Sequence, residues 1–408
     1  MDDRPPPPVH DRLPPLSGVT VIDLTQIYNG PYATFMMAMA GADVIKIEPP
    51  GGEHLRRRGV VGGAALPFAM LNANKRAVTL NLKTERGRSL LLDMVRRADI
   101  VVENFAPGTM ERLGLGWDVL SGINPRLVYG SSSGYGRSGP NRDYPAMDLT
   151  VQAMSGIMSV TGYPDRPPLK TGPAIADFSA GIHLYGAVMT ALFERERTGR
   201  GRLVEVSMQE AVYATLSSSL GMMHGAAGGE VPARTGNRHS GMAESPYNVY
   251  PTRDGFIAII CVGEAHWRSL LAMMEREDLA DDPRFVTLKT RVAHMDLVDE
   301  IVGAWTAGWD KQALFDALIA RHVPCSPVRD LAEVVNDPHM HARGALQKID
   351  HPELGPITVP HSALRFEGSA LTELTPSTAL GAGNHDVYGG WLGLSADEIA
   401  ELRTSGVI

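Results

Sequence analysis

Short apolar runs and helical patterns alternate along the first half of the chain. Strands are predicted over residues 19–24, 43–48, 77–82, 100–105, 127–133 and 203–208, where β-branched and other apolar residues cluster. Helical patterns lie between these strands, and Thr84 can cap the helix whose apolar residues are Leu90, Leu91, Met94 and Val95. Strands that alternate with helices predict an α/β fold with a doubly wound, mostly parallel sheet of the Rossmann-like kind. Ligands of such sheets bind beyond the carboxyl ends of the strands.

A second organisation begins near residue 200. Residues 221–243 are rich in glycine and weakly patterned, which favours a connector or lid, and residues 247–262 predict a β-hairpin that turns at Asp254–Gly255. Helical patterns fill residues 264–321, and the chain then predicts short strands at 357–360 and 363–367 and a last helix at 396–406. We expect a flexible, proline-rich tail over residues 1–15 and a large domain over 16–225. A linker and a smaller domain are expected over 226–330.

Composition narrows the class of protein. The 408 residues carry 38 Lys+Arg against 46 Asp+Glu, a net charge of −8, which argues against a nucleic-acid binder. Cys261 and Cys325 have no CxxC spacing, so we expect no disulfide framework, no thiolate metal site and a cytoplasmic location. The most apolar helical stretch, residues 180–193, is shorter than the ~20 residues that a bilayer requires, so a buried helix and no membrane span are predicted.

Two short motifs suggest chemistry that their context disfavours. Residues Gly134–Gly139 match the G-x-G-x-x-G dinucleotide fingerprint, but Pro140, Asn141 and Arg142 continue a loop where the fingerprint needs a helix. His339 and His341 have no third ligand nearby, so no metal site is expected.

Asp177 is the strongest candidate for chemistry, and local sequence leaves two interpretations of it. It lies between an apolar segment and the start of the predicted buried helix, where an aspartate is most often an N-cap. It can also be a functional carboxylate, because the helix dipole favours its ionised form and the small residues Ser179, Ala180 and Gly181 leave room for a substrate.

Five long segments between about Leu16 and Val407 stand out: LSGVTVIDLTQIYNGPYATFMMAMAGADVIKIEPPGG, NANKRAVTLNLKTERGRSLLLDMV, ADIVVENFAPGTMERLGLGWDVL, NPRLVYGSSSGYGRSGP and DFSAGIHLYGAVMTALFERERTGRGRLVEVSMQEAV. In sequence, order and spacing they resemble the family III CoA-transferases. The resemblance implies that Asp177 is the nucleophile, which forms an aspartyl anhydride and then an aspartyl-CoA thioester. Coenzyme A and its acyl esters would be substrates, with no prosthetic group.

The resemblance also implies a CoA site. It assigns phosphate contacts to Lys83 and Arg112 and adenine packing to Leu80. Positions that line the pantetheine tunnel or lie near it are Tyr28, Asn29, Asn104, Phe105, Ala106 and Asp148. One family arginine is Pro49 here, and Arg56, Arg57 and Arg58 are offered as its replacement.

Related enzymes set the alternatives. The α-methylacyl-CoA racemases share the aspartate but need a second base, a His where this chain has Met147, although Glu264 matches a racemase acid. Glu264 can equally be a helix-start acid. A noncatalytic homologue that binds CoA esters is a further alternative.

Architecture and substrate are also expectations from the resemblance. Family members form interlocked, ring-like homodimers with a discontinuous large domain and an inserted smaller α+β domain. The resemblance therefore implies that the large domain of this chain resumes at residues 331–408. Residues Gly236–Gly241 match the position of a glycine-rich lid but read GNRHSG. The expected reaction moves CoA from a short acyl-CoA such as succinyl-CoA to a carboxylic acid, with Arg238 or His239 as the group that attracts a dicarboxylate.

Overall fold

The computed structural model describes residues 12–58 and 65–408, which divide into two compact units. The first unit takes in the chain up to Val151 together with Ala174–Val212 and Val335–Ile408. The second takes in Gln152–Pro173 and Tyr213–Val334. Residues 1–11 of the predicted tail lie outside the described residues, whereas the Arg12 N–H donates to the Gly368 carbonyl at 3.1 Å.

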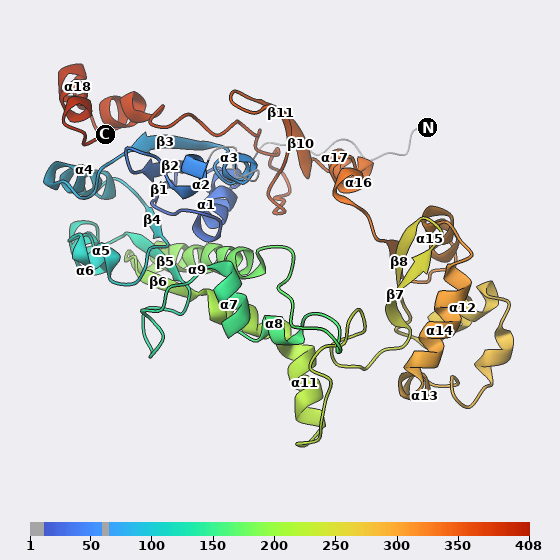
Figure 1. Ribbon diagram of the computed structural model, residues 1–408. Coiled ribbons are helices and arrows are strands. Elements are labelled where there is room, and N and C mark those ends of the chain that lie inside the picture. Colours follow the sequence, from blue (N-terminus) through green and yellow to red (C-terminus); the bar gives the residue numbers. More distant parts are fainter. Residues whose placement is uncertain (1–11, 59–64) are drawn as a thin grey trace. The chain divides into compact units, whose positions relative to one another are not determined.

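Six parallel strands form the central sheet of the first unit, in the order β3-β2-β1-β4-β5-β6 (Figure 1). They are β1 (Thr20–Asp23), β2 (Asp43–Glu48), β3 (Lys75–Thr79), β4 (Ile100–Glu103), β5 (Val128–Ser133) and β6 (Leu203–Ser207). Val21 of β1 is in register with Val44 of β2 on one side and with Ile100 of β4 on the other. This confirms the predicted mixed α/β class with a parallel sheet. The order of strands reverses between β1 and β4, which is where open α/β sheets place their ligands.

Helices cover both faces of this sheet. The first face packs against α1 (Asn29–Met39) and α9 (Ile175–Thr198) through residues such as Val21, Val102 and Leu184. The second face, which includes Ile22 and Tyr129, packs against α4 (Glu85–Val95), α6 (Trp117–Ile123), the π-helix His385–Trp391 and α18 (Ala396–Thr404). Successive strand residues thus enter different cores, which explains why the strands are nearly continuous apolar runs.

The expectation about the most apolar helix needs a correction. Helix α9 has 24 residues, so it is long and apolar enough to cross a membrane by length and composition. The expected stretch, residues 180–193, is only the most apolar part of this helix, which begins at Ile175 and ends at Thr198. Buried residues along its length, including Leu184, join the sheet core, which is the position of a core helix.

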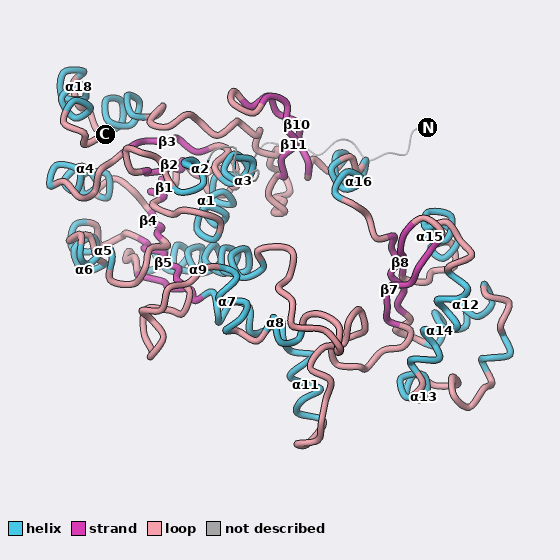
Figure 2. The backbone as a smooth tube through the Cα atoms, viewed as in Figure 1, coloured by secondary structure: helices cyan, strands magenta, loops and turns pink. Residues whose placement is uncertain are grey.

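Shorter helices surround the sheet or follow it in the chain. They are α2 (His54–Arg58), α3 (Ala65–Leu71), α5 (Thr109–Arg112), α7 (Asp148–Met154), α10 (Met208–Tyr213), α16 (Leu331–Val335) and α17 (Pro338–Ala342). A separate antiparallel hairpin joins β10 (Leu346–His351) to β11 (Gly355–Pro360) (Figure 2).

The second unit is built on a three-stranded antiparallel sheet of β7 (Tyr247–Thr252), β8 (Gly255–Ile260) and β9 (Cys325–Pro327). The predicted hairpin is confirmed, with Arg253 and Asp254 between the strands. Its helices are α8 (Ile157–Val160), α11 (Ser217–Gly225), α12 (Glu264–Met273), α13 (Leu288–Ala293), α14 (Met295–Thr306) and α15 (Lys311–Ile319), with 3-10 turns at Ala214–Leu216 and Glu277–Ala280. Trp267, Leu270 and Phe285 lie in its core.

Two strand predictions are wrong in part. The strand expected over residues 77–82 is β3 (Lys75–Thr79), because the chain turns away after Thr79 and the Asn81 N–H donates to the Val407 carbonyl at 2.8 Å. Residues 363–367 form no strand. The partner of β11 is instead β10, whose alternating pattern places Ile349 against the sheet core.

Candidate active site

A cavity of about 500 Å³ opens at the carboxyl edge of the sheet, beside the point where the strand order reverses. It is lined by the segments that follow β1, β4 and β5 and by the start of α9. The residues that matter below are Gln26, Ile27, Asn29, Asn104, Phe105, Ala106, Arg112, Asp143, Met147 and Asp177.

Asp177 lies in the first turn of α9 and is 8% exposed. The N-cap position belongs to Ala174, and the Asp148 carboxylate accepts the N–H groups of Ala176 at 2.9 Å and Asp177 at 3.3 Å. The interpretation of Asp177 as an N-cap is therefore wrong, because Asp148 of α7 satisfies the first turn. Within residues 12–58 and 65–408, no hydrogen bond to the Asp177 carboxylate is found, so this group is available to a ligand in the cavity.

Burial and charge together change the acidity of Asp177. Burial raises its pKa, and the nearby negative charge of Asp148 raises it further, to about 7. A carboxyl with this pKa exists in both protonation states near neutral pH. Perturbed carboxyls that face a cavity are frequent features of catalytic sites.

Asn29 brings α1 close to the same face of α9. Its Nδ2 donates to Ser132 Oγ at 2.9 Å, while its buried Oδ1 has no hydrogen-bond partner in the described part of the chain. A Cβ atom on Gly181, one turn after Asp177, would lie 2.6 Å from the Asn29 carbonyl, so glycine is required for this contact. Tyr28 stacks on Phe178 with ring centroids 6.0 Å apart and does not line the cavity.

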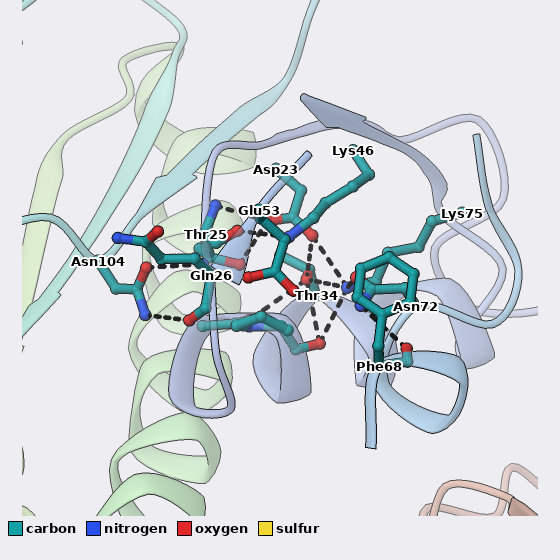
Figure 3. A network of polar contacts seen from close by, with 12 residues as sticks. Asp23, Thr25, Gln26, Thr34, Lys46, Glu53, Phe68, Asn72, Lys75 and Asn104 are labelled. Carbon is teal, nitrogen blue, oxygen red and sulfur yellow. Dashed lines mark hydrogen bonds and ion pairs between the residues drawn. The ribbon is translucent and has the colours of Figure 1, made fainter. Parts of the chain in front are cut away.

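The segment after β4 supplies three more of the predicted CoA residues. Asn104 Oδ1 accepts the Gln26 N–H at 2.9 Å, and its Nδ2 donates to the Gln26 carbonyl at 2.8 Å (Figure 3). The Phe105 N–H donates to Glu103 Oε2 at 2.8 Å, which fixes the turn into Ala106. Burial raises the pKa of Glu103 to about 7, although its hydrogen bonds act in the opposite direction.

A second cavity, of about 280 Å³, holds the remaining predicted residues of this edge. Leu80 and Lys83 line it, and Gln26 and Phe105 line both cavities, so the two are neighbours. Leu80 forms part of an apolar floor with Leu24, Ile47, Leu82 and Leu113. Lys83 is exposed at this cavity, and Arg112 lies in the larger one.

The proposed replacement of the family arginine is not supported for Arg56. Its guanidinium donates to both oxygens of the buried Glu48, at 3.0 and 2.9 Å, and to the Thr378 carbonyl at 3.0 Å. Arg57 contacts His54 Nδ1 at 3.2 Å. The charge of Arg56 is thus used inside the protein.

A buried polar network beneath the cavity was missed by the sequence analysis (Figure 3). Lys75 Nζ donates to Asp23 Oδ2 at 2.9 Å, to Thr34 Oγ1 at 2.8 Å and to the Pro31 carbonyl at 3.0 Å. Burial alone would raise the pKa of Asp23, but the charges of Lys75 and Lys46 and two threonine hydroxyls lower it to about 2. Charged residues inside otherwise apolar strands were the available signal, since such groups are buried only when paired.

Residues predicted from the second half of the chain have other partners. Arg238 pairs with Asp296 at 2.6 Å and Asp299 at 2.7 Å, so its charge is neutralised within the second unit and the idea that it attracts a dicarboxylate loses its support. His239 Nδ1 accepts the Gly241 N–H at 3.2 Å. Glu264 begins α12 and binds the buried Arg291 through both oxygens, at 2.8 and 2.9 Å, which favours the helix-start interpretation over a racemase acid.

Neither of the two short motifs has the structural context that its chemistry requires. Residues 134–147 form a loop, and the next helix, α7, starts only at Asp148. His341 Nε2 contacts the Val335 carbonyl at 2.9 Å, and the described residues hold no group of three or more His, Cys, Asp or Glu side chains suited to a metal.

The family model for CoA-transferase family III matches residues 16–384. The chain belongs to CoA-transferase family III. This confirms the resemblance, and the chain is a CoA-transferase.

Named relatives in this family cover almost the whole chain. The formyl-CoA:oxalate CoA-transferase of Streptomyces avermitilis is 38% identical over 96% of this chain and 99% of its own length. The acetyl-CoA:oxalate CoA-transferase of Acetobacter aceti is 40% identical over 87% of this chain and 90% of its own. The succinate–glutarate CoA-transferase of Agrobacterium fabrum is 36% identical over 88% and 92%.

Solved structures in the same family share the fold. A CAIB/BAIF family protein from Brucella suis superposes with a TM-score of 0.81 at 32% identity, over 93% of this chain and 100% of that chain. Rv3272 from Mycobacterium tuberculosis superposes with a TM-score of 0.79 at 30% identity, over 91% of this chain and 98% of that chain.

Proposed function

We propose that this family III CoA-transferase moves CoA from a short acyl-CoA to a carboxylic acid, with Asp177 as the nucleophile. The observation that carries the proposal is the buried Asp177 carboxylate, which lines the cavity and has no hydrogen bond in the part of the chain that the structure describes. A nucleophile needs an accessible lone pair, and this carboxylate has one.

The reaction proceeds by four exchanges at carbonyl carbon. The Asp177 carboxylate attacks the thioester carbonyl, the C–S bond breaks, and the products are a mixed anhydride and CoA thiolate. The thiolate attacks the aspartyl carbonyl, which releases the donor acid as its carboxylate and leaves an aspartyl-CoA thioester. The acceptor carboxylate then repeats both steps in reverse. No water, redox partner or prosthetic group enters, and one difficult exchange becomes several nearly isoenergetic ones.

Both intermediates react with water, so the site must exclude it during turnover. The predicted lid at Gly236–Gly241 remains part of the proposal. Gly236 adopts φ +63°, a left-handed conformation suited to glycine.

We propose that the two neighbouring cavities bind different parts of CoA. We assign the apolar floor at Leu80 to the adenine and the cations Lys83 and Arg112 to the phosphates. The segment Asn104–Ala106, with Asn29, would border the pantetheine on its way to Asp177. Tyr28 and Asp148 would support the site indirectly. Tyr28 stacks on Phe178, and Asp148 accepts a hydrogen bond from the first turn of α9.

The acid substrates are proposed from the relatives. Their names include oxalate and glutarate, so we propose a short carboxylic acid, with dicarboxylates first among those to test. A panel of acyl-CoA donors and acids, followed by chromatography of the new acyl-CoA, tests this. If no donor–acid pair in the panel gives a new acyl-CoA, the proposal is contradicted.

The racemase alternative has less support than transfer. Met147 lines the cavity, but a thioether cannot accept a proton, and Glu264 is bound to Arg291. Loss of α-deuterium from a 2-methylacyl-CoA in the presence of the enzyme would support racemisation.

Turnover of any donor–acid pair also separates the proposal from a noncatalytic binder of CoA esters, which would form no new acyl-CoA.

We expect the rate of formation of the aspartyl-CoA thioester to increase with pH. The pH profile of kcat/KM should rise with a midpoint near pH 7, which is the acid limb of the profile. Only ionised Asp177 can attack, and its pKa is about 7 because of burial and the charge of Asp148. Asp148→Asn keeps an oxygen that can accept the two N–H groups but removes the charge, so it should move the limb of kcat/KM to lower pH.

Asp143→Asn is the matched control, because Asp143 is an exposed carboxylate of the same cavity. It should leave the limb in place. A limb that moves equally in both variants would contradict the coupling between Asp148 and Asp177.

We also propose an obligate, interlocked homodimer, as the family resemblance implies, and a cytoplasmic location, as the use of cysteine suggests. Light scattering during size exclusion should give the dimer mass at all concentrations at which the enzyme is active. An active monomer would contradict the first of these proposals.

A further inference from the structure

The loop between β1 and α1 carries a backbone conformation that its residue disfavours. Ile27 has φ +68°, in the left-handed region, although it is β-branched. Such residues rarely adopt this region, because the branched side chain crowds the backbone. Ile27 lines the larger cavity, next to Gln26, which lines both.

Side chains of β2 and of the segments that follow β2 and β4 hold this loop at three successive residues (Figure 3). Lys46 of β2 donates to the Thr25 carbonyl, and Asn104 binds both the N–H and the carbonyl of Gln26. Glu53 Oε2 accepts the Ile27 N–H at 3.4 Å. The Thr25 carbonyl, both backbone groups of Gln26 and the Ile27 N–H therefore each have a side-chain partner.

Two of the side chains that hold this loop, Lys46 and Glu53, are charged groups that are costly to bury. Lys46 is fully buried and Glu53 is 4% exposed. Glu53 Oε1 is buried and has no hydrogen-bond partner in the described residues. Buried polar atoms without partners reduce stability. Strain and an unsatisfied carboxylate oxygen on one loop indicate a functional constraint on its shape.

We propose that Asn104 and Glu53 are positioning residues, which hold Ile27 in its left-handed conformation and so keep Gln26 and Asn29 in the shape that binds CoA. This rests on the proposed function only for the identity of the ligand. It gives Asn104 a different task from the direct pantetheine contact that the resemblance implies, because both polar atoms of its amide are already bound to Gln26.

A double-mutant cycle on CoA affinity tests the proposal, because free CoA binds without any step at Asp177. Asn104→Ala should weaken calorimetric binding of CoA about tenfold, since the loop can relax to negative φ. Ile27→Gly alone should change it less than about threefold, because glycine adopts positive φ without strain. In the Asn104→Ala/Ile27→Gly double variant, affinity should return to within about threefold of wild type. The remaining contacts from Lys46 and Glu53 then suffice.

The controls separate positioning from contact and from folding. Asn124 likewise binds the backbone through its side chain, because its Nδ2 donates to the carbonyls of Val95 and Ala98, but it lies outside both cavities. Asn124→Ala should therefore leave CoA affinity unchanged. If Asn104→Ala does not fold, Asn104→Asp serves, since it keeps the acceptor for the Gln26 N–H and loses the donor. An affinity loss that Ile27→Gly does not restore would overturn the proposal and return Asn104 to direct contact. Failure to detect CoA binding by the wild type would instead contradict the proposed function.

Discussion

Asp177→Asn is expected to abolish CoA exchange, with a loss of kcat on the order of 10⁴-fold or more. An amide of the same shape cannot attack a thioester, and every proposed intermediate is formed on this side chain. CoA affinity should stay close to that of wild type, because the cavity keeps its size and its cations. Chromatographic detection of the new acyl-CoA, together with calorimetric binding of free CoA, measures both quantities.

The same variant should be more stable than wild type above neutral pH. The folded-state pKa of Asp177 is about 7, above the ordinary 3.8, so ionisation destabilises the fold as pH rises through this range. Asp177→Asn removes that penalty, which accumulates between about pH 4 and 7 and amounts to about 4 kcal/mol at pH 8, against less than about 1 kcal/mol at pH 4. Asp143→Asn is the control, and it should change neither exchange nor stability much. Exchange that survives in Asp177→Asn would contradict the role of this residue.

Lys75→Met is expected to reduce the free energy of unfolding by about 3–5 kcal/mol, because it leaves the Asp23 carboxylate buried without its main partner. Lys75 and Asp23 are both almost fully buried and lie 2.9 Å apart. Urea unfolding followed by circular dichroism measures the loss.

Arg76→Met, at the next position of the same strand, is the matched control. Arg76 pairs with Asp43 and Asp386, but at an exposed surface, so its loss should amount to about 1 kcal/mol or less. The two variants should also differ in pH dependence. The folded pKa of Asp23 is lowered to about 2, so the stability from its ionised form is present above pH 4 and is lost between about pH 4 and 2. Equal losses in Lys75→Met and Arg76→Met would contradict the account of the network.

Hydrophobic periodicity predicted the parallel sheet well, because strands buried on both faces leave long β-branched runs such as the segment around Val21 and Ile22. It failed where the apolar pattern was weak. Residues 363–367 were expected to form a strand, but they pair with no other strand. Strand β10, in contrast, contains several polar residues and was not predicted, yet it pairs with β11. Helix α9 is longer than its most apolar stretch, residues 180–193, because charged residues such as Arg195 and Arg197 form its last turns.

The residues of the site could be named from sequence only through resemblance. The structure brings Asp177, Asn29, the segment after β4 and Arg112 to one cavity, and Leu80 with Lys83 to its neighbour. Local sequence could not show that Asp148 accepts the N–H groups of the first turn of α9, since Asp148 and Ala176 lie 28 residues apart in the chain. Nor could it show that Arg56 and Arg238 are already paired, because ion-pair partners are set by tertiary packing.

Covalent trapping tests the central claim most directly. The enzyme is incubated with short acyl-CoA esters, quenched with hydroxylamine or borohydride, digested and analysed by mass spectrometry, with Asp177→Ala and free CoA as controls. We predict modification of the peptide that contains Asp177 in the wild type with acyl-CoA, and none in either control. Robust CoA exchange with no modification of Asp177, or with modification of another residue, would contradict the covalent mechanism.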